Sequence, residues 1–182
     1  MTKTRGQRAE AAAAYYENEF PNPLIAMRYE HDPEATHRTY AQYLGIARGV
    51  VAQAEDGMYP LIPAAYRRHI TNIRETNQAY QQFRKARREV FWDKSDFPET
   101  PAPKNPMGKL LQWFDLSAYV MASRLCVPHG DIHRLTHGAR SLTESTTAAF
   151  KQIGLDDTWI NQFNDSLRRT HAPRVSTTIR NP

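Results

Sequence analysis

An internal repeat constrains the fold of this chain more than any other feature. Residues 36–57 and 117–138 share one pattern of small and apolar positions when Gly45 is aligned with Cys126. The matching pairs are Thr36 and Ser117, Ala41 and Ala122, Leu44 and Leu125, Ile46 and Val127, Val51 and Ile132, Ala54 and Leu135, and Gly57 and Gly138. An Asn-Pro-apolar triplet precedes each copy, and the two lead-ins differ in length by two residues. The repeat predicts that the chain builds one small structural unit twice.

Each copy has the residue types of two helices joined by a tight turn. Thr36 and Ser117 stand where a helix N-cap is needed, because a hydroxyl oxygen accepts hydrogen bonds from amides of the first turn. Ala41 and Ala122 are small, as the close crossing of two helices requires. Gly45 favours the positive φ of a tight turn. A glycine also follows the second helix of each copy, which favours the end of that helix.

The remainder of the chain also indicates helices, and no segment shows the alternation of a β-strand. Residues 7–19 are rich in alanine, and Pro21 ends the helix expected there. The longest expected helix runs over residues 70–91, with an apolar stripe and an opposite polar face that we expect to be solvated. The polar face carries Arg74, Gln78, Gln81, Arg84, Arg87 and Arg88. The expected fold class is therefore all-α.

A proline-rich segment suggests where the chain divides. Four prolines fall within residues 98–106, which excludes a helix or a central strand and predicts a semi-rigid spacer. The basic stretch from Arg168 onward is poor in apolar residues and predicts a flexible tail. The expected parts are an N-terminal arm and helix (1–21), a first unit (22–70), a connecting helix with its linker (71–104), a second unit (105–164) and a tail (165–182).

The two copies resemble the helix-turn-helix DNA-binding domains of the Xre/phage-repressor family. The first copy keeps the glycine of the turn, Arg48 after it and Glu55 near the end of the second helix, whereas an alanine replaces the usual capping serine. The second copy departs further, with Cys126, Pro128 and Thr136 where glycine, serine and glutamate are usual. The resemblance implies two small helix-turn-helix bundles in tandem, joined by the long helix and the proline-rich spacer.

In that family the helix after the turn enters the major groove of DNA, and this implies which residues contact it. In the first unit they are Arg48, Gly49 and Gln53, with His37 and Arg38 on phosphates or beside the reading helix. In the second unit they are His129, Gly130, His133 and Arg134. Arg48 suits guanine O6 and N7, and Gln53 suits adenine. Asp131, on the second of these helices, is expected to repel phosphate unless it accepts a hydrogen bond from a cytosine amine.

The charge of the chain favours a polyanionic partner. The formal net charge at pH 7 is +5, and most cations are arginines, whose planar fork suits phosphates and guanine edges. A GC-rich genome enriches arginine as well, so both explanations stay open. Basic residues near the two ends are expected to lie along phosphates or in the minor groove, or else to form flexible ends without a contact. They are Lys3, Arg5, Arg8, Arg168, Arg169 and Arg174.

Two other kinds of site have weaker support. His129, His133 and His137 recur every four residues, with Asp131 and Cys126 nearby, and histidines at this spacing can chelate zinc. The glycine after the third histidine is expected to end the helix, however, and groove-facing positions explain the same spacing, so no metal is expected. The sequence has no glycine-rich phosphate loop, nucleophile elbow or clustered acid pair. We therefore expect neither an enzyme nor a cofactor.

The expected function is sequence-specific regulation of transcription by a repressor of the phage immunity type, which binds double-stranded DNA. Because the exposed residues of the two units differ, one monomer is expected to bind an asymmetric site. The alternative is a DNA-binding assembly or adaptor protein, such as a phage packaging subunit, a partition adaptor or an antitoxin, with a protein partner on residues 70–97. With one cysteine, no leader and no apolar run of ~20 residues, the chain is expected on the nucleoid in the bacterial cytoplasm, not in a membrane.

Overall fold

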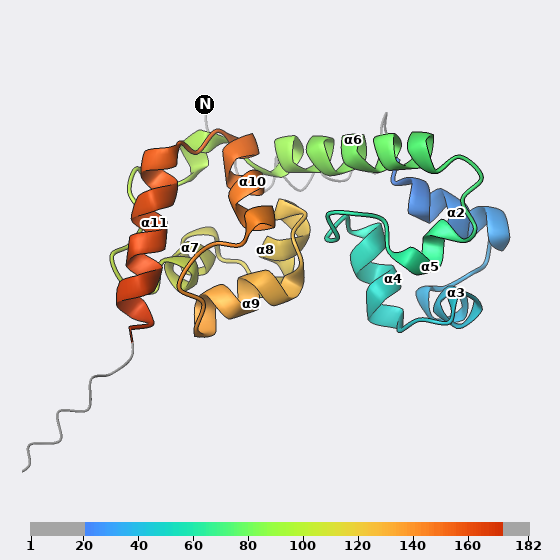
Figure 1. Cartoon of the computed structure of the whole chain (residues 1–182), viewed down its shortest axis with the longest axis horizontal. Helices are drawn as coiled ribbons and strands as arrows, with labels where there is room; N and C mark the ends of the chain where they lie inside the picture. The colour runs from blue at the N-terminus through green and yellow to red at the C-terminus, as the bar shows by residue number, and fades with distance from the viewer. Residues whose placement is uncertain (1–20, 173–182) are drawn as a thin grey trace, which may run out of the picture.

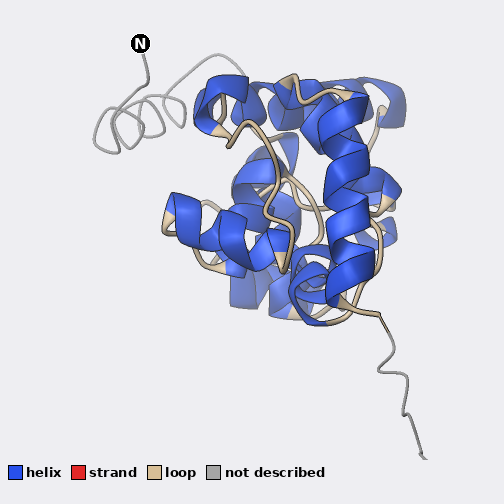
Figure 2. Ribbon diagram, turned by 90° about the vertical axis from the view of Figure 1, so that its left-hand side faces the viewer, coloured by secondary structure: helices blue, strands red, loops and turns tan. Residues whose placement is uncertain are grey.

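The computed structural model describes residues 21–172, and the regular structure of this part is helical, with no strand (Figures 1 and 2). The all-α fold class is therefore confirmed. The α-helices are α2 (Pro23–His31), α3 (His37–Leu44), α4 (Arg48–Glu55), α5 (Ala64–Arg67), α6 (Ile73–Phe91), α7 (Pro106–Phe114), α8 (Ala118–Leu125), α9 (His129–His137), α10 (Glu144–Ile153) and α11 (Asp157–Thr170), and a 3-10 helix, η1, spans Lys94–Asp96. None of the described helices is long and apolar enough to cross a bilayer. The alanine-rich helix expected before Pro21 lies outside the described residues.

Capping and turn residues determine the local structure of each copy of the repeat. The hydroxyl oxygens of Thr36 and Ser117 each accept a hydrogen bond, at 3.2 Å, from an amide in the first turn of α3 and of α8. Gly45 ends α3 with a φ of 69°, and Cys126 ends α8 with a φ of 53°. Both turns use the left-handed conformation, so the alignment of Gly45 with Cys126 holds in three dimensions. We call α3 and α4 the first helix pair, and α8 and α9 the second helix pair.

The Asn-Pro lead-ins begin equivalent helices. The Asn22 side-chain oxygen accepts from the Leu24 amide at 2.9 Å, and the Asn105 oxygen accepts from the Gly108 amide at 3.2 Å. A proline follows each asparagine at the first helical position, where an amide hydrogen would have no partner within the helix. Asn22 is also buried, and its amide nitrogen donates to the carbonyl of Glu55 at 2.7 Å. The lead-in is thereby tied to the end of α4.

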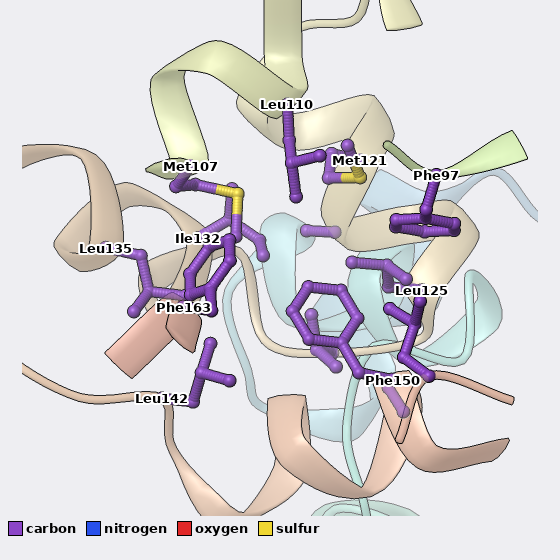
Figure 3. Packing of buried hydrophobic residues seen from close by; sticks show 14 of the residues in the cluster. Phe97, Met107, Leu110, Met121, Leu125, Ile132, Leu135, Leu142, Phe150 and Phe163 are labelled. Carbon is purple, nitrogen blue, oxygen red and sulfur yellow. The ribbon is translucent and has the colours of Figure 1, made fainter. Parts of the chain in front are cut away.

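The helices pack around two hydrophobic cores. The first bundle comprises α2 to α5 and the beginning of α6, and its buried residues are Leu24, Ala35, Tyr40, Ala41, Leu44, Val51, Ala54, Ile62, Tyr66, Tyr80 and Phe83. The second bundle comprises the end of α6 and α7 to α11, and its core is built mainly from Phe, Trp, Leu, Ile and Met side chains. Figure 3 shows Phe, Leu, Ile and Met side chains of this core. The apolar pairs Leu44 with Leu125 and Val51 with Ile132 are buried in their respective cores. The repeat therefore describes two bundles built on equivalent positions.

Helix α6 belongs to both bundles and runs along one side of the molecule (Figure 1). Its middle contributes Tyr80 and Phe83 to the first core, and its end contributes Phe91 to the second. The face that we expected to be solvated carries Arg84, Arg87 and Arg88, and these side chains are instead 7%, 4% and 6% exposed. The expectation is wrong for them because the second bundle covers this face of α6 and supplies carbonyl oxygens to the three guanidinium groups.

The proline-rich segment lies along the second bundle rather than between the two bundles. Phe97, just before it, is buried in the second core, and Pro101 is buried as well. The indole nitrogen of Trp159 donates to the carbonyl of Pro98 at 3.0 Å. At the other end, the Asn105 amide donates to the Thr170 hydroxyl at 2.7 Å. The connection between the bundles is therefore α6.

The last helix extends beyond its expected end. We expected the helical region to finish near Asn164, but α11 continues to Thr170. Its apolar stripe reaches Leu167, which is completely buried, and Ser166 beside it is 2% exposed. The burial of Leu167 thus keeps the basic residues around it helical, although their composition alone predicts a flexible tail.

Candidate functional site

The candidate residues gather at the N-terminal ends of α4 and α9, the second helix of each pair. Both helices lie on the same side of α6 (Figure 1). Arg48 and Gly49 are exposed at the start of α4, and Gly130 is exposed at the start of α9, where His129 is half-buried. A Cβ atom added to Gly49 or to Gly130 would meet nothing within 4 Å. The backbone at each helix start is therefore open to a large ligand.

These two helix starts differ from most of the others in the residue at the N-cap. Among the described helices, α4 and α9 share with the single-turn α5 the lack of a side-chain hydrogen bond at the N-cap, where Ala47 and Pro128 stand. The amides of the first turn and the helix dipole place partial positive charge at such an end, which favours an anion. The arginine side chain of Arg48 adds a full charge beside α4. The opening at the start of α4 therefore suits an anion, whereas the first turn of α9 also carries the carboxylate of Asp131.

A buried ionic network supports the first helix pair. The Arg28 guanidinium donates to both carboxylate oxygens of Glu55, at 2.8 and 3.0 Å, and to the carbonyl of Ala35 at 2.5 Å. This hydrogen bond to Glu55 raises the pKa of the Arg28 guanidinium above its ordinary value. His37 Nε2 lies 2.9 Å from the same carboxylate. The structure thus places His37 against Glu55, in a position that steadies α3 beside α4, whereas Arg38 next to it is exposed.

A different network supports the second helix pair. Asp131 is 6% exposed, and its carboxylate accepts from the Arg134 guanidinium at 2.5 Å and from the Thr143 hydroxyl at 2.7 Å. Thr143 is also the N-cap of α10. We expected Asp131 to face a ligand and to repel phosphate, but its side chain instead joins α9 to the start of α10. Arg134 remains two-thirds exposed and can contact a ligand from this position.

The three histidines of α9 form a row on its surface. The rings of His133 and His137 stack with centroids 4.3 Å apart, and the rings of His129 and His133 are 6.3 Å apart. His137 Nδ1 lies 2.9 Å from the carbonyl of His133. Within residues 21–172, no group of three His, Cys, Asp or Glu side chains is placed to hold a metal ion. Cys126 points away from this row into the interior, and burial raises the pKa of its thiol.

Tyr119, at the start of α8, contacts residues next to both reading candidates, α4 and α9, and the sequence did not predict it as a site residue. Its hydroxyl lies 3.1 Å from a carboxylate oxygen of Asp56, which follows α4, and its ring centroid is 5.6 Å from that of His129. Burial and the Asp56 charge raise the pKa of Tyr119 to about 12. The end of α4 and the start of α9 are therefore neighbours. An aromatic residue at an exposed position in the first turn of α8 was the available signal.

The candidate arm residues divide into two groups. Lys3, Arg5, Arg8 and Arg174 lie outside the described residues. Arg168 and Arg169 lie on the last turn of α11 rather than in a tail, and both are exposed. Arg168 pairs with Asp165 at 2.7 Å, and Arg169 donates to the Ser166 hydroxyl at 3.1 Å.

The aromatic part of the surface considered for a protein partner on residues 70–97 is covered, whereas much of the polar part is exposed. Its aromatic residues Phe91, Trp92 and Phe97 are between 6% and 7% exposed and belong to the second core, not to the first bundle or to a free face.

Gln53, in the middle of α4, is half-buried and the least accessible of the candidate residues on that helix. The exposed candidates are thus the residues at the start of α4, and Gly130, His133 and Arg134 along α9. Comparison of the chain with protein families, with curated proteins and with solved structures finds no match.

Proposed function

We propose that this protein binds double-stranded DNA in a sequence-specific manner, with α4 and α9 as reading helices in the major groove. The observation that carries the proposal is the presence of two helix pairs with left-handed turns, in each of which the second helix starts uncapped and open to solvent. A helix start of this kind attracts phosphates, and exposed side chains in the first turns can reach base edges. The net charge of +5 acts in the same direction.

The two reading helices carry unlike residues, and this defines the kind of site. Helix α4 presents Arg48 and, further along, Gln53, whereas α9 presents His133 and Arg134. Arg48 is suited to guanine O6 and N7. Two unlike readers on one chain match an asymmetric site, whereas a dimer of identical readers matches a palindrome. We therefore propose a monomeric regulator of transcription of the phage immunity-repressor type, with no catalytic step.

The test is the salt dependence of duplex binding, measured by fluorescence anisotropy on a duplex obtained by selection from random sequences. The logarithm of the association constant should fall linearly with the logarithm of salt concentration, with a slope of about −0.9 for each phosphate contacted. Arg48→Ala should cost about 1–3 kcal/mol on the preferred duplex and relax preference at one base position. Arg38→Ala should weaken binding to all duplexes and reduce the slope by about 1.

Arg74→Ala is the matched control, because Arg74 is an exposed arginine in the first turn of α6 and belongs to neither α4 nor α9. It removes the same charge and should leave base preference unchanged. A flat salt response, or equal effects of Arg48→Ala and Arg74→Ala, would contradict the proposal.

A further inference from the structure

The arginine cluster of α6 (Arg84, Arg87 and Arg88) joins the two bundles. Arg84 makes the most direct connection, because its Nε donates to the carbonyl of Gly57 at 2.9 Å and its Nη2 donates to the carbonyl of Cys126 at 2.8 Å. Gly57 follows α4, and Cys126 is the turn residue between α8 and α9. One planar guanidinium thus holds the end of one helix pair against the turn of the other.

Arg87 and Arg88 add contacts on the same side of α6. Arg87 donates to the carbonyl of Ser123 at 3.1 Å and to its hydroxyl at 2.6 Å, and its Nη2 lies 3.6 Å from a carboxylate oxygen of Asp56. Arg88 donates to the side-chain carbonyl of Gln152 on α10 at 2.9 Å. Burial lowers the pKa of Arg84 and of Arg88. For Arg84, the carbonyl of Cys126 at the end of α8 offsets part of the cost of burying the charge, because it belongs to the negative end of the helix dipole.

The apolar contacts around the cluster leave little space. Met58, two residues after Asp56, is completely buried and belongs to the second hydrophobic core, although it directly follows the first helix pair. Gly57 has a φ of 73°, and a Cβ there would lie 2.8 Å from the Phe83 ring and 3.5 Å from the Cys126 sulfur. Glycine is required here by the positive φ and by the Phe83 ring of α6, and the second bundle approaches to ordinary van der Waals distance at Cys126.

We propose that Arg84 and Arg87 are positioning residues that hold α4 and α9 at one separation and orientation, so that the protein accepts only one spacing between the two halves of its DNA site. This inference rests on the proposed function of α4 and α9. It differs from a model in which a spacer joins two independent readers, because the proline-rich segment lies along the second bundle and its length does not set their distance. Specificity for spacing would then be a property of the bundle interface.

The first experiment measures the interface without DNA. Spin labels are placed on cysteines introduced by Glu34→Cys in the first bundle and Asn161→Cys in the second, both exposed positions, while Cys126 is fully buried. The label-to-label distance distribution should be a single narrow peak for the otherwise unchanged protein. Arg87→Gln should broaden it, and Arg74→Gln, the same change at an exposed position of α6, should not. A broad distribution before any interface substitution would overturn the proposal.

Since Arg87→Gln removes a buried group, a second and milder variant is needed. Tyr119→Phe deletes only the hydroxyl that meets Asp56 at 3.1 Å, so the bundles should remain folded. A folded Tyr119→Phe protein should show a measurably wider distance peak than the parent. Unchanged peaks in both Arg87→Gln and Tyr119→Phe would contradict the assignment of the interface as the source of rigidity.

The second experiment varies the DNA. Inserting one base pair between the two halves of a selected site rotates one half by about 34° relative to the other. The affinity of the parent protein should fall about tenfold or more, and Arg87→Gln should lose less on the same insertion. Equal affinity of the parent for all spacings would overturn this inference and leave the proposed function standing. Failure to bind any duplex would overturn both, whatever the distance distribution.

Discussion

The two bundles build the same turn between two helices with different chemistry. In the first bundle, a buried ion pair between Arg28 and Glu55 joins α2 to α4, and His37 joins α3 to it. In the second bundle, Leu111 occupies the place of Arg28 in the lead-in helix, and Thr136 occupies the place of Glu55. There the polar support is instead the Asp131 carboxylate, which accepts from Arg134 and from Thr143 and joins α9 to the start of α10. The same backbone geometry is therefore compatible with polar networks at different positions.

The residues that form the two turns also differ. Gly45 is exposed and reaches its φ of 69° without a steric penalty, whereas Cys126 has a side chain and a φ of 53°. The left-handed conformation costs a non-glycine residue about 1–2 kcal/mol. Cys126 is 0% exposed, so burial of its thiol offsets this cost in the second turn. A turn residue that looks unfavourable in the sequence is thus explained by what lies around it.

The largest expected effect comes from breaking the ion pair of the first bundle. Glu55→Gln removes the negative charge from a carboxylate that is 5% exposed and leaves the Arg28 guanidinium buried without a counter-charge. Breaking such a pair typically costs about 3–5 kcal/mol. The free energy of unfolding, measured by urea denaturation with circular dichroism, should fall by this amount.

The matched substitution in the second bundle is Thr136→Ala, at the equivalent position. Thr136 is half-buried, and its hydroxyl donates within α9, to the carbonyl of His133 at 2.7 Å. A change of this kind should cost about 0.5 kcal/mol. Similar losses at residues 55 and 136 would mean that the two bundles do not differ in how they are supported.

A smaller effect is expected from alkaline pH, because the first core contains buried tyrosines where the second contains Phe and Trp. Burial raises the pKa of Tyr40 to about 12, and that of Tyr66 still further. In the unfolded chain the tyrosine ionises near pH 10, whereas in the folded protein Tyr40 ionises near pH 12. The free energy of unfolding is therefore unaffected by this group below pH 10, and it falls as the pH rises from 10 to about 12. Tyr40→Phe should therefore remove about 1.4 kcal/mol of the alkaline loss of stability per pH unit between pH 10 and about 12.

Thermal unfolding between neutral and alkaline pH measures this effect, with tyrosinate absorbance as the readout for tyrosine ionisation and tryptophan fluorescence for the second bundle, which carries Trp92, Trp113 and Trp159. Trp159 is buried in the second core, whose side chains do not titrate in this range. If the stability of the Tyr40→Phe protein depends on pH as that of the parent does, the pKa of Tyr40 is not raised in the folded protein, which contradicts the prediction.

Much of each bundle could be predicted from local sequence, whereas the interface between them could not. The caps at Thr36 and Ser117 and the left-handed turn at Gly45 depend on residues a few positions away, and such signals are present in the sequence. The burial of Arg84 and Arg87 depends on carbonyl groups 36 to 42 residues away in the chain. Three arginines on one face of a helix look solvated until the second bundle is placed against them. The same holds for Asp131, whose partner Thr143 lies on the next helix.

The central claim is that α4 and α9 read different halves of one DNA site, and selection of duplexes from a random pool tests it most directly. The selection would be run with the unchanged protein, with Arg48→Ala and with His133→Ala, both exposed positions at the reading helices. We predict non-palindromic sites of roughly 10–16 base pairs. Arg48→Ala should relax preference in one half of the site, and His133→Ala should relax it in the other half or reduce total affinity. Selected sites that are inverted repeats, or loss of preference at the same bases in both variants, would contradict the account.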